Sequence, residues 1–276
     1  MPHNLWIGRP GSLREITQAA KSWDRSADLG VTEFRSLAGR ATVVATPKAV
    51  RRTKYSWESL DQATATFLDR LARRIDGPGP IALIDPAAVN LLEPGQVSGT
   101  ARPGSGGQNQ WFVLANSTGA IVESTTVPGA FGFQSTAVTS MFGWRHPVWV
   151  GVPVMPGMTV SFLLPGGFPA ATAAAQLDFK AADGSYLSSA VATGLLVGAV
   201  VPAGAAFVTP VGKAGAVASY SLAGACLTIG GDVPAAGLAG DGCPGMSITG
   251  YTDSSASRLP YRNVSLDLLE VGSAVG

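Results

Sequence analysis

The sequence contains few charged residues and few of the side chains that most often carry chemistry. Of its 276 residues, 13% are charged, two are histidine and two are cysteine. Two cysteines and two distant histidines are too few ligands for an ordinary zinc site. A formal net charge of +1 gives no whole-chain basic field for nucleic acid. We therefore expect no cofactor and no sequence-specific nucleic-acid binding.

Catalytic motifs are also scarce. A Ser-His hydrolase would have to use His146, because the other histidine is His3, and no G-x-S-x-G elbow is present. The glycine-rich segment 104–107 is not followed by Lys-Ser or Lys-Thr, so it does not predict a phosphate-binding loop. Most acidic residues after position 110 lie beside Gly or Ser, where Asp stabilises turns. We expect no catalytic residues and no enzyme activity.

A membrane span is not expected either. The first residues lack a basic segment followed by a long apolar run, so they predict no secretory signal. Residues 184–212 carry no charge, but they contain Pro202, Pro210 and several glycines. A spanning helix needs about 20 strongly apolar residues without such interruptions. We interpret residues 184–212 as two or three strands.

The residues that are abundant favour an all-β fold. Hydrophobic residues make up 46% of the chain, with 35 glycines and 19 prolines. This apolar content excludes a disordered chain, and many turn formers with few charges are typical of many short strands. The length fits two domains. Charge is divided unevenly, with net +4 in residues 1–102 and net −3 in residues 103–276, which also indicates two domains.

The central stretch, residues 148–190, predicts a β-meander. Gln176 to Lys180 alternates polar and apolar residues, and Asp183-Gly184 suits a tight hairpin turn. The phrase VPVMPGMTVSFLL followed by QLDFKAADGSYLSS resembles the core of carbohydrate-binding-module-like jelly rolls. The resemblance implies a jelly-roll sandwich. It implies sugar binding less strongly, because this fold hosts many functions.

One helix is expected, over residues 59–75. Ser59 can serve as its N-cap, apolar residues recur at helical spacing, and Gly77-Pro78 ends it. We predict a β domain with this helix over residues 1–93, a Gly/Pro/Ser linker over 94–109, and a β-sandwich over 110–276.

The order of these elements resembles the minor tail and distal tail proteins of siphophages of actinobacteria. The residues that carry the resemblance are Tyr55-Ser56-Trp57, the helix 59–75, Ile84-Asp85-Pro86 with Asn90, and the closing segment 259–272. The resemblance implies a tail-tube-like N-terminal β-sandwich and a homo-oligomeric ring, a hexamer in that family. Its implied partners are the tail tube and the baseplate or tail-tip proteins. The implied location is the virion tail, assembled in the host cytoplasm.

A basic and aromatic segment is the candidate for oligomer or tube contact. Its residues are Arg51, Arg52, Lys54, Tyr55 and Trp57. A basic edge could face an acidic subunit or DNA in the tube. It could equally be a charged edge strand that discourages aggregation.

The candidates for glycan binding are aromatic residues, since flat rings stack on apolar sugar faces. They are Trp144, Trp149, Tyr220 and Tyr251. The alternative is that these rings fill the core of a sandwich. Calcium is common in the jelly rolls that the chain resembles, but no cluster of oxygen ligands is evident. Cys226 and Cys243 either form a disulfide or are two buried thiols.

Three functions stay open at this point. The preferred one is a structural minor tail protein of a bacteriophage, ring-forming at the distal end of the tail tube, whose jelly roll contacts host-surface glycan. The alternative is a non-catalytic glycan-binding protein. A polysaccharide depolymerase ranks last, because no acid pair can be named for it.

Overall fold

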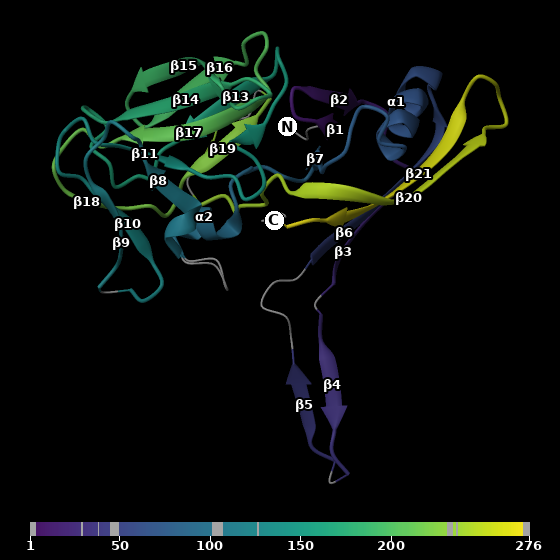
Figure 1. Ribbon diagram of the computed structural model, residues 1–276, viewed down its shortest axis with the longest axis horizontal. Helices are drawn as coiled ribbons and strands as arrows, with labels where there is room; N and C mark the ends of the chain where they lie inside the picture. Colours follow the sequence, from purple (N-terminus) through teal and green to yellow (C-terminus); the bar gives the residue numbers. More distant parts are fainter. Residues whose placement is uncertain are drawn as a thin grey trace. The chain divides into compact units, whose positions relative to one another are not determined.

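The computed structural model shows an all-β fold with one α-helix flanking a sheet (Figure 1). The structure describes residues 4–28, 30–37, 39–44, 50–100, 107–125, 127–230, 234–235 and 237–272. The chain forms two compact units. Unit 1 joins residues 1–15 and 82–244, and unit 2 joins residues 16–81 and 245–276.

These units differ from the expected boundaries at 93 and 110. The last two strands, β20 (Gly245–Ser255) and β21 (Arg262–Glu270), belong to unit 2, where β21 pairs with β6 (Val50–Leu60). In this pairing Val264 and Leu266 lie opposite the aromatic residues Trp57 and Tyr55, so the apolar positions of both strands share one face. The C-terminal strands therefore complete the N-terminal sheet and do not belong to the second sandwich.

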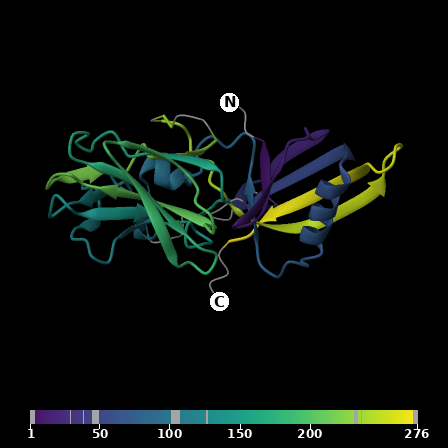
Figure 2. The same ribbon diagram turned by 90° about the horizontal axis from the view of Figure 1, so that it is seen from above.

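The sheet of unit 2 has the order β20–β21–β6–β3, with β3 (Ser22–Asp28) as its end strand. Helix α1 (Gln62–Ala72) lies against β20 and β21, as Figure 2 shows beside the two yellow strands. The side chains of Tyr55, Trp57 and Leu68 are nearly inaccessible to solvent. The apolar face of the sheet and the apolar face of α1 therefore form the core of this unit.

The observed helix is shorter than the expected one over residues 59–75. Asp61 is its N-cap, because Asp61 Oδ1 accepts a hydrogen bond from the Thr64 backbone N–H at 2.9 Å. Ser59 lies one residue before the end of β6 and has a φ of 57°, which is not the extended conformation of an N-cap residue. Arg73 caps the C-terminus, and Arg74 has a left-handed φ of 57°. The sequence therefore placed the helix correctly but its start two residues too early.

Unit 2 also contains a separate two-stranded hairpin, made by β4 (Thr32–Arg35) and β5 (Ala41–Val44).

The described residues of unit 1 form three sheets and a smaller strand group. The first sheet has the order β15–β14–β17–β11–β8, with β12 paired to β17; the second is β16–β13–β19; the third is β18–β10–β9. The smaller group contains three strands that lie side by side in the order β2 (Ser12–Ile16), β1 (Leu5–Arg9) and β7 (Ile81–Ile84). The remaining bounds are β8 (Trp111–Val113), β9 (Ala120–Glu123), β10 (Phe131–Gln134), β11 (Met141–Trp144), β12 (Val152–Pro153), β13 (Thr159–Leu163), β14 (Ala174–Lys180), β15 (Tyr186–Thr193), β16 (Leu196–Val200), β17 (Phe207–Lys213), β18 (Ser219–Ser221) and β19 (Cys226–Ile229).

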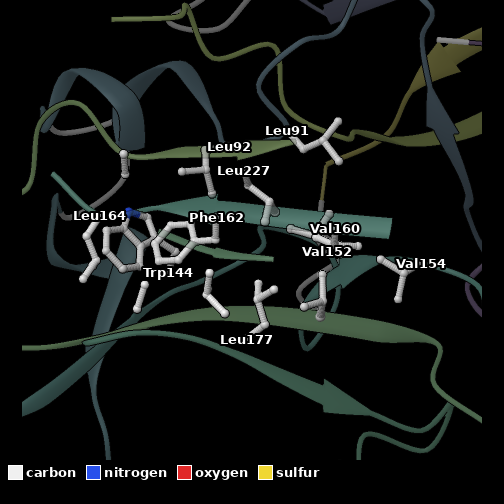
Figure 3. Close-up of a cluster of buried hydrophobic side chains, with 14 of the residues drawn as sticks. Leu91, Leu92, Trp144, Val152, Val154, Val160, Phe162, Leu164, Leu177 and Leu227 are labelled. Atoms are coloured by element: carbon white, nitrogen blue, oxygen red, sulfur yellow. The ribbon is translucent and has the colours of Figure 1, made fainter. Parts of the chain in front are cut away.

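The core of unit 1 lies between the first two sheets, as in a β-sandwich. Figure 3 shows Phe162 of β13 and Leu227 of β19 on one side and Leu177 of β14 on the other, with Trp144 beside them. Leu177, Phe162 and Leu227 are completely buried. The alternation expected along β14 is confirmed, since Leu177 points inward and its neighbours are partly exposed.

The charge-free segment 184–212 is confirmed as strands, because it forms β15, β16 and most of β17. Within the described residues, no helix has the length and apolar character needed to cross a membrane.

The first part of the expected linker 94–109 is a packed helical turn. Helix α2 (Pro94–Ser98) begins with a capping box formed by Glu93 and Gln96. The buried Gln96 amide donates hydrogen bonds to the carbonyls of Gln110 and Arg145, at 3.0 and 2.6 Å. Residues 101–106 lie outside the described part of the chain.

Asn90 ties several segments of unit 1 together from a fully buried position. Its Nδ2 donates to the carbonyls of Ala225 and Leu238 at 3.1 and 3.2 Å. Its Oδ1 accepts from the backbone N–H groups of Leu92 and Leu227, each at 3.1 Å. The side chain therefore uses both donors and both acceptor positions.

Candidate assembly surface

The β4–β5 hairpin is exposed along its whole described length. All eight residues of its two strands are exposed. Among the described strands, β4 and β5 pair only with each other, and Figure 1 draws them as two strands without a covering layer. The hairpin therefore has no hydrophobic core of its own in the single chain.

The two faces of this hairpin differ in charge. The register places Phe34 opposite Thr42 and Thr32 opposite Val44. Because directly opposite residues share a face, this face carries two apolar side chains, two threonines and no charge. We call it the Phe34/Val44 face. Phe34 is 58% exposed and Val44 is 56% exposed.

The opposite face of the hairpin is charged. It presents Glu33, Arg35, Ala41 and Val43. Arg35 Nε donates to Glu33 Oε1 at 2.6 Å, and both side chains are well exposed. An exposed ion pair of this kind adds little stability but keeps the surface hydrated. The hairpin is thus amphipathic, with one face suited to burial and the other to water.

A two-stranded hairpin is marginally stable at best in water unless another layer covers it. The Phe34/Val44 face also places apolar side chains in solvent, with Leu37 fully exposed in the segment between the strands. Burying such surface is favourable by about 25 cal/mol per Å². The hairpin therefore gains most when a partner covers its Phe34/Val44 face.

Strand β3 forms the exposed edge of the unit 2 sheet. Each of its residues is exposed, and it pairs with β6 from Ser22–Ser56 to Asp28–Val50. Three charged side chains, Asp24, Arg25 and Asp28, lie along it. Charged residues on an edge strand discourage uncontrolled pairing. The charged edge strand that discourages aggregation is therefore β3. The basic segment of residues 51–57 is not at the edge, because β6 lies between β3 and β21.

The basic residues of β6 are engaged within the sheet. Arg52 Nη2 donates to Asp28 Oδ2 at 3.2 Å, and Lys54 Nζ lies 3.4 Å from Asp267 Oδ1. The Arg51 backbone N–H donates to Glu270 Oε2 at 3.2 Å. A hydrogen bond from Gly30, followed by the Arg52 guanidinium, lowers the pKa of the Asp28 carboxyl.

A shallow cavity of about 330 Å³ lies on this polar sheet face. Asp24, Lys54 and Asp267 line it and occupy opposite positions on β3, β6 and β21. Two carboxylates flank one ammonium group there. The described part of this face is therefore a mixed surface, which does not favour contact with DNA.

Tyr55 and Trp57 do not form a contact surface. They are 1% and 2% exposed, and their rings stack with centroids 5.5 Å apart. Trp23 of β3 stacks on Tyr55 at 6.3 Å and is 38% exposed. The aromatic part of the predicted contact segment is instead the core beneath α1, because Tyr55 and Trp57 alternate with the exposed Arg52 and Lys54.

Two of the four glycan candidates are core residues. Trp144 is 2% exposed and packs against Phe162 edge to face at 5.0 Å. Tyr220 is 7% exposed, stacks on Phe168 at 4.2 Å and donates its hydroxyl to the Ala216 carbonyl. Both rings are nearly inaccessible to solvent and pack on neighbouring rings, which favours the alternative that they fill the sandwich, although Tyr220 also contributes to the lining of a cavity described below.

The other two glycan candidates are half-buried. Trp149 packs against the core of unit 1, with its ring 5.0 Å from that of His146. Tyr251 lies on β20 opposite the buried Leu266. Burial, followed by the charges of Asp253 and Asp69, raises the pKa of Tyr251 to about 12. The hydroxyl oxygen of Tyr251 is itself buried.

His146 has a structural role. Its Nδ1 accepts hydrogen bonds from the backbone N–H groups of Val148 and Trp149, at 3.1 and 3.2 Å. Its Nε2 lies 2.8 Å from the Cys243 carbonyl. An Nδ1 that accepts leaves the proton on Nε2, which then donates to this carbonyl. The neutral ring thus holds the loop 145–151.

Two ionisable groups of unit 1 are partly buried side by side on β14. Burial raises the pKa of Asp178, which accepts a hydrogen bond from Gln176 Nε2 at 2.6 Å. Burial also lowers the pKa of Lys180, whose Nζ donates to the Val150 carbonyl at 2.9 Å. Thr209 Oγ1 donates to the same carbonyl. Lys180 and Thr209 thus stabilise the loop 145–151 through the Val150 carbonyl, in addition to the hydrogen bonds of His146.

Cys226 and Cys243 are both buried free thiols, so the disulfide alternative does not apply. Burial raises the pKa of the Cys226 thiol. Within the described residues, no three His, Cys, Asp or Glu side chains gather as metal ligands.

A second cavity, of about 610 Å³, lies in unit 1 over strands β9, β10 and β18. Its lining includes Gln134, Ser219 and Ser221, with Glu123 as its charged residue. Gly132 of β10 also lines the cavity, and β10 lies between β18 and β9. A Cβ at this position would meet the Tyr220 carbonyl at 2.8 Å. Apolar side chains such as Val122, Val127 and Phe131 line it as well, so the cavity has a mixed polar and apolar lining.

The alternation in residues 29–35 and the β-branched residues in 41–46 predict strands, and the described parts of these segments form β4 and β5. The sequence does not predict that both strands are exposed and form the candidate assembly surface. The intervening Ser36–Arg40 contains Gly39 with a φ of 77°, a turn signal that could have joined them into a hairpin. Exposure of both strands could not be read from residue type.

No family model, curated protein or solved structure matches the chain.

Proposed function

We propose that this chain is a structural subunit that assembles with copies of itself, as a minor or distal tail protein of a bacteriophage. The observation that carries the proposal is the β4–β5 hairpin, whose uncharged face is exposed in the single chain. The resemblance of residues 55–57, of the helix and of the closing strand to siphophage tail proteins supports the same function. A ring at the distal end of the tail tube is the form of assembly it implies.

The partner of the hairpin is another copy of the chain. A ring-forming subunit meets its own copies at the highest local concentration, and an interface repeated around a ring needs an element that reaches beyond its own core. The hairpin supplies such an element. Its outer edges also have backbone groups that can extend a sheet of the neighbour, while the Phe34/Val44 face packs.

Two adjacent valines test this contact. Val44 lies on the uncharged face and Val43 on the face with Glu33 and Arg35. Both are well exposed, at 56% and 60%, so an aspartate at either position leaves the free energy of unfolding of the single chain nearly unchanged. Val44→Asp would bury an unpaired carboxylate in the contact and weaken self-association by about a hundredfold.

The measurement is the mass of the purified protein by light scattering across a concentration series. We expect the wild-type protein and Val43→Asp to form the same oligomer, built from chains of 28.1 kDa, and Val44→Asp to have a lower mass than either, because it loses the contacts made through the hairpin. A wild-type protein that stays monomeric at every concentration overturns the proposal. Equal effects of the two substitutions would show that the Phe34/Val44 face is not the contact.

A second candidate function is glycan binding by unit 1. The observation that favours it is the cavity over β9, β10 and β18, whose lining combines hydroxyl and amide groups with apolar side chains and one carboxylate, because such a lining suits sugars, which have both polar and apolar faces. A panel of host-envelope glycans would be tested for binding to the wild-type protein and to Gln134→Ala. Binding that does not depend on Gln134 would exclude this cavity.

A further inference from the structure

Strand β15 is an exposed sheet edge without charge. It is the end strand of its sheet, and among the described strands it pairs only with β14. It lies in the charge-free segment 184–212 and is followed by β16, the end strand of the second sheet. Figure 1 shows β15 and β16 at the same end of the sandwich. Both edge strands of unit 1 at this end therefore lack charge.

Edge strands of soluble proteins are normally protected by charges, proline or irregular backbone. The only such device described in β15 is a bulge at its start, where the register with β14 shifts beside Leu187. From Ser188 to Thr193 the pairing is regular, with no charged residue and no proline. Strand β3 of unit 2, by contrast, carries three charges. The outer edge of β15 is therefore able to form a β-ladder with a further strand.

The side chains of β15 alternate between the core and solvent. Ala190 and Ala192 pack against the core of unit 1. Val191 points outward and is 58% exposed, with Ser189 and Thr193 on the same side. An added strand would thus continue a layer that already has an inner and an outer face.

We propose that β15 pairs antiparallel with β15 of a second copy of this chain, with Val191 opposite Val191 across a two-fold axis. This register places Ser189 opposite Thr193 and Ala190 opposite Ala192. The β-branched valines bury each other, and the hydroxyl residues form cross-strand pairs. Because every pair joins residues on the same face, the inner and outer layers both continue across the axis.

The partner is a second copy because the strand complements itself. An isologous contact needs a surface patch that fits its own two-fold image. The regular part of β15 has no charge that would repel its image, and its small inner alanines meet alanines. A foreign strand would require matching side chains that nothing in this edge specifies.

This contact goes beyond the proposed function and does not depend on it. It uses unit 1, whereas the hairpin contact uses unit 2. Val44→Asp removes one contact and leaves the other, so the two proposals can fail separately.

A cysteine at position 191 tests the register directly. In the proposed pairing the two copies of this residue face each other with Cα atoms about 4.5–5.5 Å apart, within the range for a disulfide. Val217→Cys is the matched control, because Val217 is an exposed valine of unit 1, 64% accessible, outside any strand. The native cysteines are buried and react with neither.

Oxidation would be carried out in the Val44→Asp background, so that contacts through the hairpin do not contribute. We expect Val191→Cys to form a covalent dimer of twice the 28.1 kDa chain mass, and Val217→Cys and Ser189→Cys to remain monomeric on denaturing gels. The proposal is overturned if Val191→Cys cross-links no faster than Val217→Cys, or if Ser189→Cys cross-links faster than Val191→Cys.

A charge at the same position gives an independent readout without oxidation. Val191→Lys places two like charges opposite each other and should abolish the two-fold dimer, while Val217→Lys should leave it intact. Both side chains are exposed in the single chain, so neither variant should shift the unfolding midpoint. A dimer that survives Val191→Lys would refute the pairing.

Discussion

Among the buried polar side chains of unit 1, we expect Asn90 to be the one whose replacement lowers the free energy of unfolding most. Asn90 is fully buried and makes four hydrogen bonds to backbone groups between 3.1 and 3.2 Å long. Asn90→Ala removes all four. It leaves the N–H groups of Leu92 and Leu227 and the carbonyls of Ala225 and Leu238 without this partner.

The size of the effect follows from these contacts. Each hydrogen bond contributes about 0.5–1.5 kcal/mol net, and a buried polar group left unsatisfied costs about 1–3 kcal/mol. Water entering the space left by the amide would satisfy part of them. We expect the free energy of unfolding to fall by about 3–5 kcal/mol, a large share of the roughly 5–15 kcal/mol of a typical domain. Asn90→Asp should be at least as damaging, because its second oxygen would face two carbonyl oxygens.

The assay is urea unfolding followed by tryptophan fluorescence, with Asn116→Ala as the matched control. Asn116 is exposed, so the same substitution there should change the free energy of unfolding by about 0.5 kcal/mol or less. The reasoning is refuted if Asn90→Ala and Asn116→Ala unfold at the same urea concentration.

Three further outcomes are expected. His146→Ala should lower the free energy of unfolding by about 1–3 kcal/mol, and His146→Asn should recover part of it, as urea midpoints would show, because an amide oxygen can accept from Val148 and Trp149 in place of Nδ1. The phenol of Tyr251 should ionise near pH 12 in an absorbance titration. The same titration of Tyr251→Phe gives the signal of the other tyrosines, which is subtracted. Since the unfolded phenol ionises near pH 10, stability should fall as the pH rises from about 10 to about 12 in the wild-type protein more than in Tyr251→Phe. Gln96→Ala should lower the urea midpoint of unit 1, because its amide joins α2 to two buried carbonyls; an unchanged midpoint would contradict this role.

Local patterns predicted much of the fold. Few charges and many turn residues predicted an all-β chain, and the alternation of Gln176 to Lys180 correctly placed Leu177 and Phe179 inward. The helix was correct in place because apolar residues recur at its period, although Asp61 rather than Ser59 caps it. These features depend on neighbours in sequence, which a single sequence displays.

Features that depend on distant segments were not predictable in the same way. The closing strand joins β6 across about two hundred residues of sequence, so its membership of unit 2 could not be read from its own alternation. Trp144 and Tyr220 carry the same side chains whether they bind sugar or fill a core, and only packing against Phe162 and Phe168 decides between these roles. The basic segment was misplaced on an edge for the same reason.

The β4–β5 hairpin shows this limit most clearly. Val43 and Val44 are adjacent, chemically identical and equally apolar, and both suggest a buried strand. In the structure both are exposed, on opposite faces of a hairpin, and only one face carries an ion pair. Exposure of apolar strands is informative because it departs from what residue type predicts.

The central claim is that the chain is a structural component of a phage tail, and gold-antibody labelling of phage particles released by the source culture tests it most directly. An antibody raised against the purified protein would be applied to intact particles and viewed by negative-stain electron microscopy. The account predicts gold clustered at the distal end of the tail. Bare phage beside well-labelled cells would contradict it.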